Sequence, residues 1–210
     1  MNGISSDDDL IALLSAPADA GTADAGTLGR LHRRLEQEAE LSGLVDVAYT
    51  IIDSPFGKLL LAATRKGLVR VAYASENHDR VLDALSQQLS PRILRAPDRL
   101  DQAARELDEY FTRGRQSFDL TVDLSLSRGF RQLVQLHLPQ IGYGQTVSYR
   151  QVAELVGSPK AVRAVGTACA TNPLPVVIPC HRVLRTDGTL GGYIGGQETK
   201  SALLSLEAAA

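Results

Sequence analysis

Three short runs that are mostly apolar and rich in strand-forming residues follow one another near the middle of the chain. The runs VAYTIID, KLLLAAT and LVRVAYA begin at residues 47, 58 and 68, and turns at Ser54–Gly57 and Lys66–Gly67 separate them. Short β-rich runs joined by tight glycine turns predict an antiparallel three-stranded meander.

The spacing of apolar residues then changes from strand-like to helical. Two helices are predicted after the meander, and FDLTVDL at 118–124 alternates and predicts one more strand. Residues 47–127 are therefore expected to form a small α/β domain, the first part of an α+β protein. The helical apolar positions are Val81, Leu82, Leu85 and Leu89 in the first helix, and Leu100, Ala104, Leu107 and Phe111 in the second.

From Arg128 onward the pattern is helical and rich in loops. One helix is expected between Phe130 and His137, and another begins at Tyr149 and ends at Gly157. Ser158-Pro159 then supplies an N-cap and a first-turn proline for a third helix. Two short helices joined by a Gly-Ser turn predict a helix-turn-helix within residues 128–210.

The second helix of this pair has little side-chain bulk. Val162 begins a buried stripe at i, i+3 and i+7, which leaves Lys160, Arg163 and Thr167 facing away. Most of its other residues are alanine or glycine, so this helix can lie close to another surface. A groove of DNA and another protein helix satisfy the spacing equally well.

Charge is divided unevenly along the chain. The formal net charge is −2, yet residues 1–46 hold nine acidic and three basic side chains, whereas residues 128–210 hold eight basic and four acidic ones. Such asymmetry suggests a nucleic-acid partner or a charged tail. Residues 1–46 are expected to form an acidic extension, with a disordered lead over 1–27 and one helix after Leu28.

Length and composition exclude several classes of protein. A chain of 210 residues with 44% hydrophobic content can bury a substantial core, which excludes wholesale disorder. The sequence contains no apolar run that could span a bilayer and begins with acidic residues, unlike a signal peptide, so we expect a cytoplasmic protein. Two cysteines and four scattered histidines predict no metal site.

The most informative string is NPLPVVIPCHRV, which begins at Asn172 and contains adjacent Cys180 and His181. A thiolate is the nucleophilic form of cysteine, and a nearby base is one common means of producing it. Adjacent side chains diverge, so the two would connect through a water or a bend. Glu207 shares a helical face with Leu203 and could orient the histidine. From spacing alone, an inert buried cysteine, a structural histidine and a solvated glutamate are the more common interpretation.

The segment from Gly142 to Glu207 resembles the O6-alkylguanine-DNA alkyltransferases, single-turnover proteins that move an alkyl group from guanine onto their own cysteine. The resemblance rests on several motifs in order, and residues 47–127 suit the variable first domain of that family. These motifs are the helix pair in GQTVSYRQVAELVGSPKAVRAVGTACA, the Asn-Pro-x-Pro hinge, Pro-Cys-His-Arg, GGYIGG and the terminal glutamate.

The resemblance assigns a catalytic role to five residues. It implies that Cys180 accepts the alkyl group, that His181 is a water-mediated base and that Glu207 orients the histidine. It further implies that Asn172 braces the cysteine segment. Tyr149 would hydrogen-bond the flipped guanine and help it leave as a neutral base; from the apolar spacing alone, Tyr149 is a core residue.

The resemblance also assigns DNA and base contacts. Arg163 would enter the base stack in place of the flipped guanine, and Tyr193 lies in the loop that closes over the base. Lys160 and Arg182 belong to the basic segment expected to touch phosphate. Ile194 stands where some relatives have a small hydroxyl residue, so only its backbone N–H could reach the alkylated oxygen, and tolerance of bulky alkyl groups is in question.

The implied function is irreversible, single-turnover repair of O6-methylguanine in double-stranded DNA, with O4-methylthymine as a second candidate substrate. No cofactor is needed, and a monomer is expected. Base flipping would expose the lesion, because a base inside the duplex cannot reach the cysteine. The alternative is a non-catalytic damage-binding protein of the alkyltransferase-like kind, which replaces the nucleophile; the presence of Cys180 disfavours it.

Overall fold

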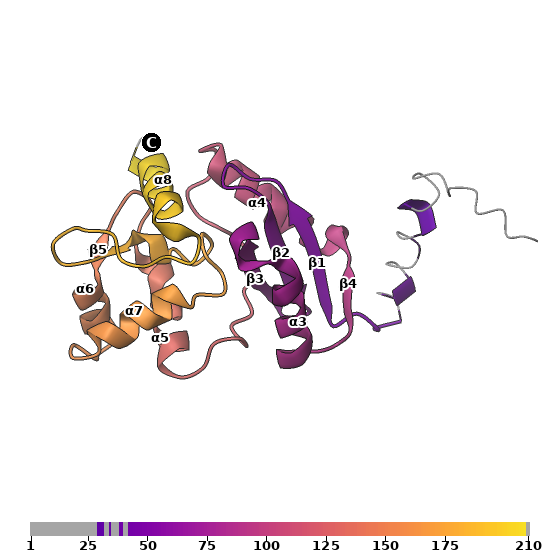
Figure 1. Cartoon of the computed structure of the whole chain (residues 1–210), viewed down its shortest axis with the longest axis horizontal. Coiled ribbons are helices and arrows are strands. Elements are labelled where there is room, and N and C mark those ends of the chain that lie inside the picture. Colours follow the sequence, from indigo (N-terminus) through magenta and orange to yellow (C-terminus); the bar gives the residue numbers. More distant parts are fainter. Residues whose placement is uncertain (1–28, 32–33, 35–37, 40–41, 209–210) are drawn as a thin grey trace, which may run out of the picture.

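The computed structural model describes residues 29–31, 34, 38, 39 and 42–208. A sheet with helices on both faces forms one part of the protein, and a mainly helical part follows it (Figure 1). The predicted disordered lead lies outside the described residues. Of the helix predicted after Leu28, the structure describes residues 29–31, 34, 38 and 39, all of which are helical.

The predicted meander is confirmed, and it belongs to a larger sheet. β1 (Val47–Ile52), β2 (Leu59–Thr64) and β3 (Gly67–Tyr73) pair in antiparallel fashion, as the glycine turns predict. A fourth strand, β4 (Ile93–Arg95), pairs parallel to β1 and gives the order β3-β2-β1-β4. The sequence does not predict β4, because a strand of three residues is too short to show an alternating pattern.

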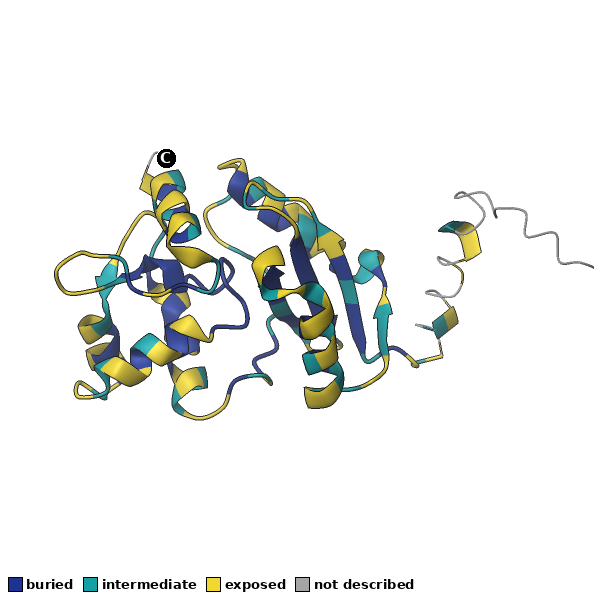
Figure 2. Ribbon diagram, viewed as in Figure 1, coloured by how far each residue is buried: buried dark blue, intermediate teal, exposed yellow. Residues whose placement is uncertain are grey.

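Both faces of the sheet are covered (Figure 2). Leu60 and Ala62 of β2 pack toward α3 (His78–Gln88), whereas Leu59 and Leu61 face the cluster that includes α4 (Asp101–Phe111). Burial on both faces explains why β2 is a continuous apolar run rather than an alternating one.

The strand predicted at 118–124 is wrong. Val122 forms only an isolated parallel bridge with Leu68, where the Leu68 amide donates to Thr121 at 2.9 Å. The Asp123 carboxylate then accepts from Thr64 Oγ1 and turns the chain. Further along β3, the amide of Val71 donates to the carbonyl of Pro173 instead, so the helical part occupies the remainder of this strand edge.

The helical part contains the predicted helix pair, α6 and α7. α5 and α8 complete this part, and two short strands pair in parallel. Its elements are α5 (Phe130–His137), β5 (Val147–Ser148), α6 (Tyr149–Leu155), α7 (Val162–Ala170), β6 (Val183–Leu184) and α8 (Gly196–Ala208). Short 3-10 turns lie at Ala74–Glu76, Pro97–Leu100, Leu138–Gln140 and Cys180–Arg182.

The predicted N-cap of the second helix is wrong by three residues. α7 begins at Val162 with Ala161 as its N-cap, because the Ser158 backbone closes the end of α6. The Ser158 amide donates to Ala153 at 2.8 Å, and the Ala161 amide donates to the Ser158 carbonyl, which completes a separate turn. The buried stripe of α7 is as predicted, and Arg163 is exposed.

Candidate active site

Cys180 lies at the end of a completely buried segment, 172–179, that connects α7 to the cysteine. Asn172 holds both ends of this segment together: its side-chain amide donates to Ile178 O at 2.8 Å and to Cys180 Sγ at 3.2 Å. Its carbonyl oxygen accepts from the Leu174 amide at 3.0 Å. The thiol is therefore fixed by an amide with no solvent exposure rather than by a mobile loop.

Backbone strain also marks this segment. Val176 has a φ of 73°, a left-handed conformation that a β-branched residue rarely adopts. Its side chain is buried, and Asn172 braces the chain on either side of it. Packing and hydrogen bonds around the segment therefore hold a conformation that its own residues do not favour.

His181 and Glu207 form a buried pair, with His181 Nε2 2.9 Å from Glu207 Oε1. A carboxylate can only accept a hydrogen bond, so Nε2 carries the proton and Nδ1 keeps its lone pair. Nδ1 is buried and has no hydrogen-bond partner among the described residues. The tautomer thus leaves one ring nitrogen free to act as a base.

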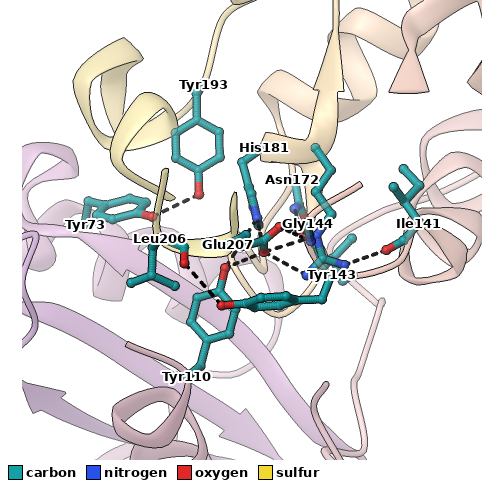
Figure 3. Close-up of polar contacts among 12 residues, drawn as sticks. Tyr73, Tyr110, Ile141, Tyr143, Gly144, Asn172, His181, Tyr193, Leu206 and Glu207 are labelled. Atoms are coloured by element: carbon teal, nitrogen blue, oxygen red, sulfur yellow. Dashed lines mark hydrogen bonds and ion pairs between the residues drawn. The ribbon is translucent and has the colours of Figure 1, made fainter. Parts of the chain in front are cut away.

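Glu207 is the centre of a larger polar cluster (Figure 3). The Arg182 guanidinium donates to both carboxylate oxygens, and the Tyr110 hydroxyl donates to Oε1 at 2.6 Å. The Gly144 amide adds a fourth donor at 3.2 Å. Tyr110 comes from α4, so the sheet-containing part supplies a side chain to this cluster.

Arg182 corrects one expectation from the sequence. It was expected to touch phosphate, but its side chain is buried, and its guanidinium pairs with Glu207 and donates to Ile141 O. The charge of Arg182 is neutralised inside the protein and is not available to a DNA backbone.

Burial determines the ionisation of the three central groups. Burial raises the pKa of the Cys180 thiol to about 11, although the Asn172 amide and the charge of Lys200 oppose the shift. Burial lowers the pKa of His181, with Glu207 opposing. Burial disfavours the Glu207 anion, but the hydrogen bonds from His181, Arg182 and Tyr110 outweigh it and lower the pKa to about 2. At neutral pH, therefore, the resting site holds a thiol, a neutral imidazole and a carboxylate.

The two tyrosines predicted to contact the base lie near Cys180. Tyr149 begins α6, and burial raises its pKa to about 12. Tyr193 is buried with its ring at a right angle to that of His181, at a centroid distance of 6.4 Å. Ile194 is half-buried. A Cβ at Gly191 would lie 2.1 Å from the Tyr149 hydroxyl, so only glycine lets the loop pass this close.

The structure does not bring every expected residue into this cluster. Lys160, in the turn before α7, and Arg163, the second residue of α7, are both exposed, whereas the residues that surround the thiol are buried. Such a position is compatible with contact to an external partner rather than with a part in the chemistry at sulfur.

Sequence reasoning missed two residues of the site. Lys200 is fully buried, donates to Val183 O and lies 5.8 Å from the centroid of the Tyr149 ring. It precedes Glu207 by seven residues, a spacing that places both on one helical face and could have revealed it. Tyr110 follows Leu107 by three residues and is indistinguishable in sequence from an ordinary core residue.

Other kinds of site find no support in the described part of the chain. No group of three or more His, Cys, Asp or Glu side chains there could hold a metal ion. No helix in the same residues is long and apolar enough to cross a membrane.

The fold and the site together define a helix-turn-helix protein with a buried cysteine that is held by an asparagine and followed in sequence by the histidine of a buried His–Glu pair. The 6-O-methylguanine DNA methyltransferase DNA-binding domain matches residues 129–209, and the ribonuclease-like domain of the same family matches residues 47–124. These two matches together cover more than half of the chain. The chain therefore belongs to the 6-O-methylguanine DNA methyltransferase family.

Individual relatives agree with this assignment. A methylated-DNA–protein-cysteine methyltransferase of Methanosarcina barkeri is 38% identical over 76% of this chain and 96% of its own length. The bifunctional transcriptional activator and DNA repair enzyme Ada of Escherichia coli is 39% identical over 77% of this chain, which spans only 46% of Ada. The crystal structure of Mycobacterium tuberculosis OGT in complex with DNA has a TM-score of 0.66 and 37% identity, and covers 77% of this chain and 93% of that one.

Proposed function

We propose that the protein repairs O6-methylguanine in double-stranded DNA by transferring the methyl group directly to Cys180. The observation that carries this proposal is the buried arrangement of Asn172, Cys180, His181 and Glu207, in which the thiol is fixed and a bare imidazole nitrogen is available. Membership of the 6-O-methylguanine DNA methyltransferase family supports the substrate. O4-methylthymine is a second proposed substrate.

The reaction exchanges one carbon–oxygen bond for one carbon–sulfur bond. Sγ attacks the methyl carbon, the bond from that carbon to O6 breaks, and guanine leaves. The thiol proton passes to Nδ1 of His181 through a bridging water, since adjacent side chains do not face each other. The resulting imidazolium is stabilised by Glu207.

The leaving base needs a proton or a hydrogen bond on its side of the reaction. Tyr149 can donate a hydrogen bond to the departing base, because burial raises its pKa to about 12 and its hydroxyl stays protonated in the neutral range. The proton that His181 takes from the thiol balances the reaction when it passes through solvent to the guanine, which then leaves as a neutral base. Tyr193 would pack on the base, and the Ile194 amide would approach the alkylated oxygen. The product at Cys180 is a thioether, which is a poor leaving group, so each molecule acts once and needs no cofactor.

Reaction at a buried thiol requires the base to leave the duplex. Extrusion costs a few kcal/mol, and a poorly paired base costs least. Arg163, exposed on α7, would fill the gap in the stack, and Lys160 would contact the backbone. The relative Mycobacterium tuberculosis OGT has been solved in complex with DNA, which supports DNA as the partner.

We further propose that the chain divides into an acidic extension, 1–46, an α/β domain, 47–127, and a DNA-binding and alkyl-acceptor domain, 128–210. The matched ranges 47–124 and 129–209 support this division. We also propose that the protein acts in the cytoplasm as a monomer.

The number of lesions repaired per protein molecule tests the function. Duplex DNA containing O6-methylguanine in excess over the protein should be repaired until one lesion per protein molecule is consumed, and no further. Repair beyond that plateau would indicate a turnover enzyme. Tight binding of the lesion without any repair would instead indicate a non-catalytic damage-binding protein.

A further inference from the structure

The end of β3 contacts the cysteine segment directly. The Val71 amide and the Arg70 guanidinium both donate to the carbonyl of Pro173, at 2.9 and 3.2 Å. Pro173 follows Asn172, the residue that holds Cys180. The sheet-containing part is therefore joined by hydrogen bonds to one side of the site.

The last residue of β3 reaches the other side. The Tyr73 hydroxyl lies 2.9 Å from the Tyr193 hydroxyl, and the two rings meet edge to face at 6.0 Å between centroids (Figure 3). Both side chains are buried, with 2% and 9% of their surface exposed. Each hydroxyl therefore relies on the other as a buried partner, and losing one leaves the other unsatisfied.

Neighbouring contacts keep Tyr73 in place and press the loop against it. The Tyr73 amide donates to the Glu76 carboxylate at 2.9 Å, and Glu76 is paired with Arg70. A Cβ at Gly195 would lie 2.7 Å from the Tyr73 ring, so the loop backbone passes against this ring. Tyr73 thus fixes both the tyrosine of the loop and the course of its backbone.

We propose that Tyr73 is a positioning residue that determines how tightly the pocket holds the extruded base. It acts through Tyr193 and has no part in the bond-making step. The inference rests on the proposed function and deepens it, because it assigns a role in base recognition to the sheet-containing part. Specificity for the alkylated base would then depend on the contact between the two parts of the chain.

The test uses free O6-methylguanine base, which avoids a bulky alkyl group, and follows its reaction with Cys180 to saturation without DNA. Two parameters are measured, the concentration that gives half the maximal rate and the maximal rate itself. The variants are Tyr73→Phe, Tyr193→Phe and the double variant. Tyr49→Phe is the matched control, since Tyr49 lies on β1 of the same sheet and packs against the opposite cluster.

Tyr73→Phe is expected to raise the half-saturating concentration about fivefold to tenfold, the effect of one lost buried hydrogen bond. The maximal rate should stay close to that of wild type, because Tyr73 has no part in the bond-making step. The half-saturating concentration of the double variant should be no higher than that of the more impaired single variant, since each single substitution already removes the same contact.

Other results would overturn the proposal. Unchanged half-saturation in Tyr73→Phe would do so, as would additive losses in the double variant. A half-saturating concentration that rises and a maximal rate that falls by the same factor, together with a lower melting temperature, would show a purely structural role. A wild-type protein that fails to react with the base and with O6-methylguanine DNA would instead refute the proposed function itself.

Discussion

Glu207 shows how much of the site depends on one carboxylate. It accepts hydrogen bonds from His181, Arg182, Tyr110 and the Gly144 amide, and it is almost completely buried. The same group fixes the histidine tautomer and neutralises the buried arginine. Function and stability are therefore coupled at this residue.

Replacing Glu207 with glutamine should destabilise the protein. The folded pKa of about 2 lies below the ordinary value of 4.5, so ionised Glu207 stabilises the folded state above pH 4.5, and this stabilisation is lost as the pH falls toward 2. The shift corresponds to roughly 3 kcal/mol. Urea unfolding at pH 7 should show a loss of about that size in Glu207→Gln, because the amide leaves Arg182 buried without its counter-charge. The difference in the free energy of unfolding between wild type and Glu207→Gln should become smaller as the pH falls from 4.5 toward 2. Equal stability of the two proteins at pH 7 would contradict this role of Glu207.

The pH dependence of methyl transfer tests the role of His181. Burial lowers its pKa below 6.5, so the imidazole stays neutral and able to accept a proton at pH 6.5 and somewhat below. We expect a rate that is flat between pH 6.5 and 8.5 and falls only at lower pH. A rate that rises tenfold per pH unit across this range would show that a free thiolate reacts without the base. If the rate instead falls to half of its plateau value at a pH above 6.5 as the pH is lowered, the lowered pKa of His181 would be contradicted.

The sequence predicted individual site residues only where a motif identified them. Cys180, His181 and Asn172 lie in one string and are brought together by its fold. Tyr110 was missed because it resembles an ordinary core residue in sequence, and Lys200 because a lysine side chain is normally exposed. Arg182 was misread because a charge is assumed to be exposed until a buried partner is known.

At the scale of elements, α7 presents one exposed face to solvent. Its buried stripe packs inward through Val165 and Cys169, and the small residues of its outer face leave Arg163 prominent. The turn that precedes it is fixed by backbone hydrogen bonds at Ser158, so its position relative to α6 is well determined.

Arg163→Ala should separate base extrusion from chemistry. Repair of O6-methylguanine in duplex DNA should slow by at least about tenfold, since the arginine no longer offsets an unstacking cost of a few kcal/mol. Reaction with free O6-methylguanine base should remain near the wild-type rate. Arg105→Ala is the matched control, because it removes an exposed arginine from α4. Equal slowing on both substrates would refute the role of Arg163.

Regular elements were predictable where the pattern was long or bounded by glycine. The meander and the helices satisfied this condition, whereas β4 has only three residues. Residues 118–124 form a single bridge to β3 at Leu68, and the Val71 amide of β3 bonds to Pro173 instead. The start of α7 was predicted too early because the Ser158 amide hydrogen-bonds to Ala153 at the end of α6, so Ser158 does not cap α7. The errors at 118–124 and at the start of α7 follow from tertiary or neighbouring contacts that local spacing does not show.

At the scale of the whole molecule, the sheet-containing part participates in the site. Tyr110 reaches Glu207, the Val71 amide holds Pro173, and Tyr73 holds Tyr193. The site is therefore built across the contact between the two parts, and neither part contains all of it.

The distribution of charge also changes once burial is known. Residues 128–210 hold eight basic and four acidic side chains, but Arg182, Lys200 and Glu207 are buried, so six bases and three acids are exposed. An exposed excess of this size predicts moderate, salt-sensitive affinity for DNA in general. Selectivity would then come from the extruded base.

The central claim is that Cys180 accepts the methyl group, and the mass of the intact protein tests it most directly. After incubation with O6-methylguanine duplex, the wild-type protein should gain one methyl group per molecule, located on the peptide that contains Cys180. Cys169→Ala should gain the same group, since Cys169 lies buried in α7, and Cys180→Ala should gain none. A wild-type mass that stays unchanged while the duplex is bound, or a methyl group found on Cys169, would contradict the account.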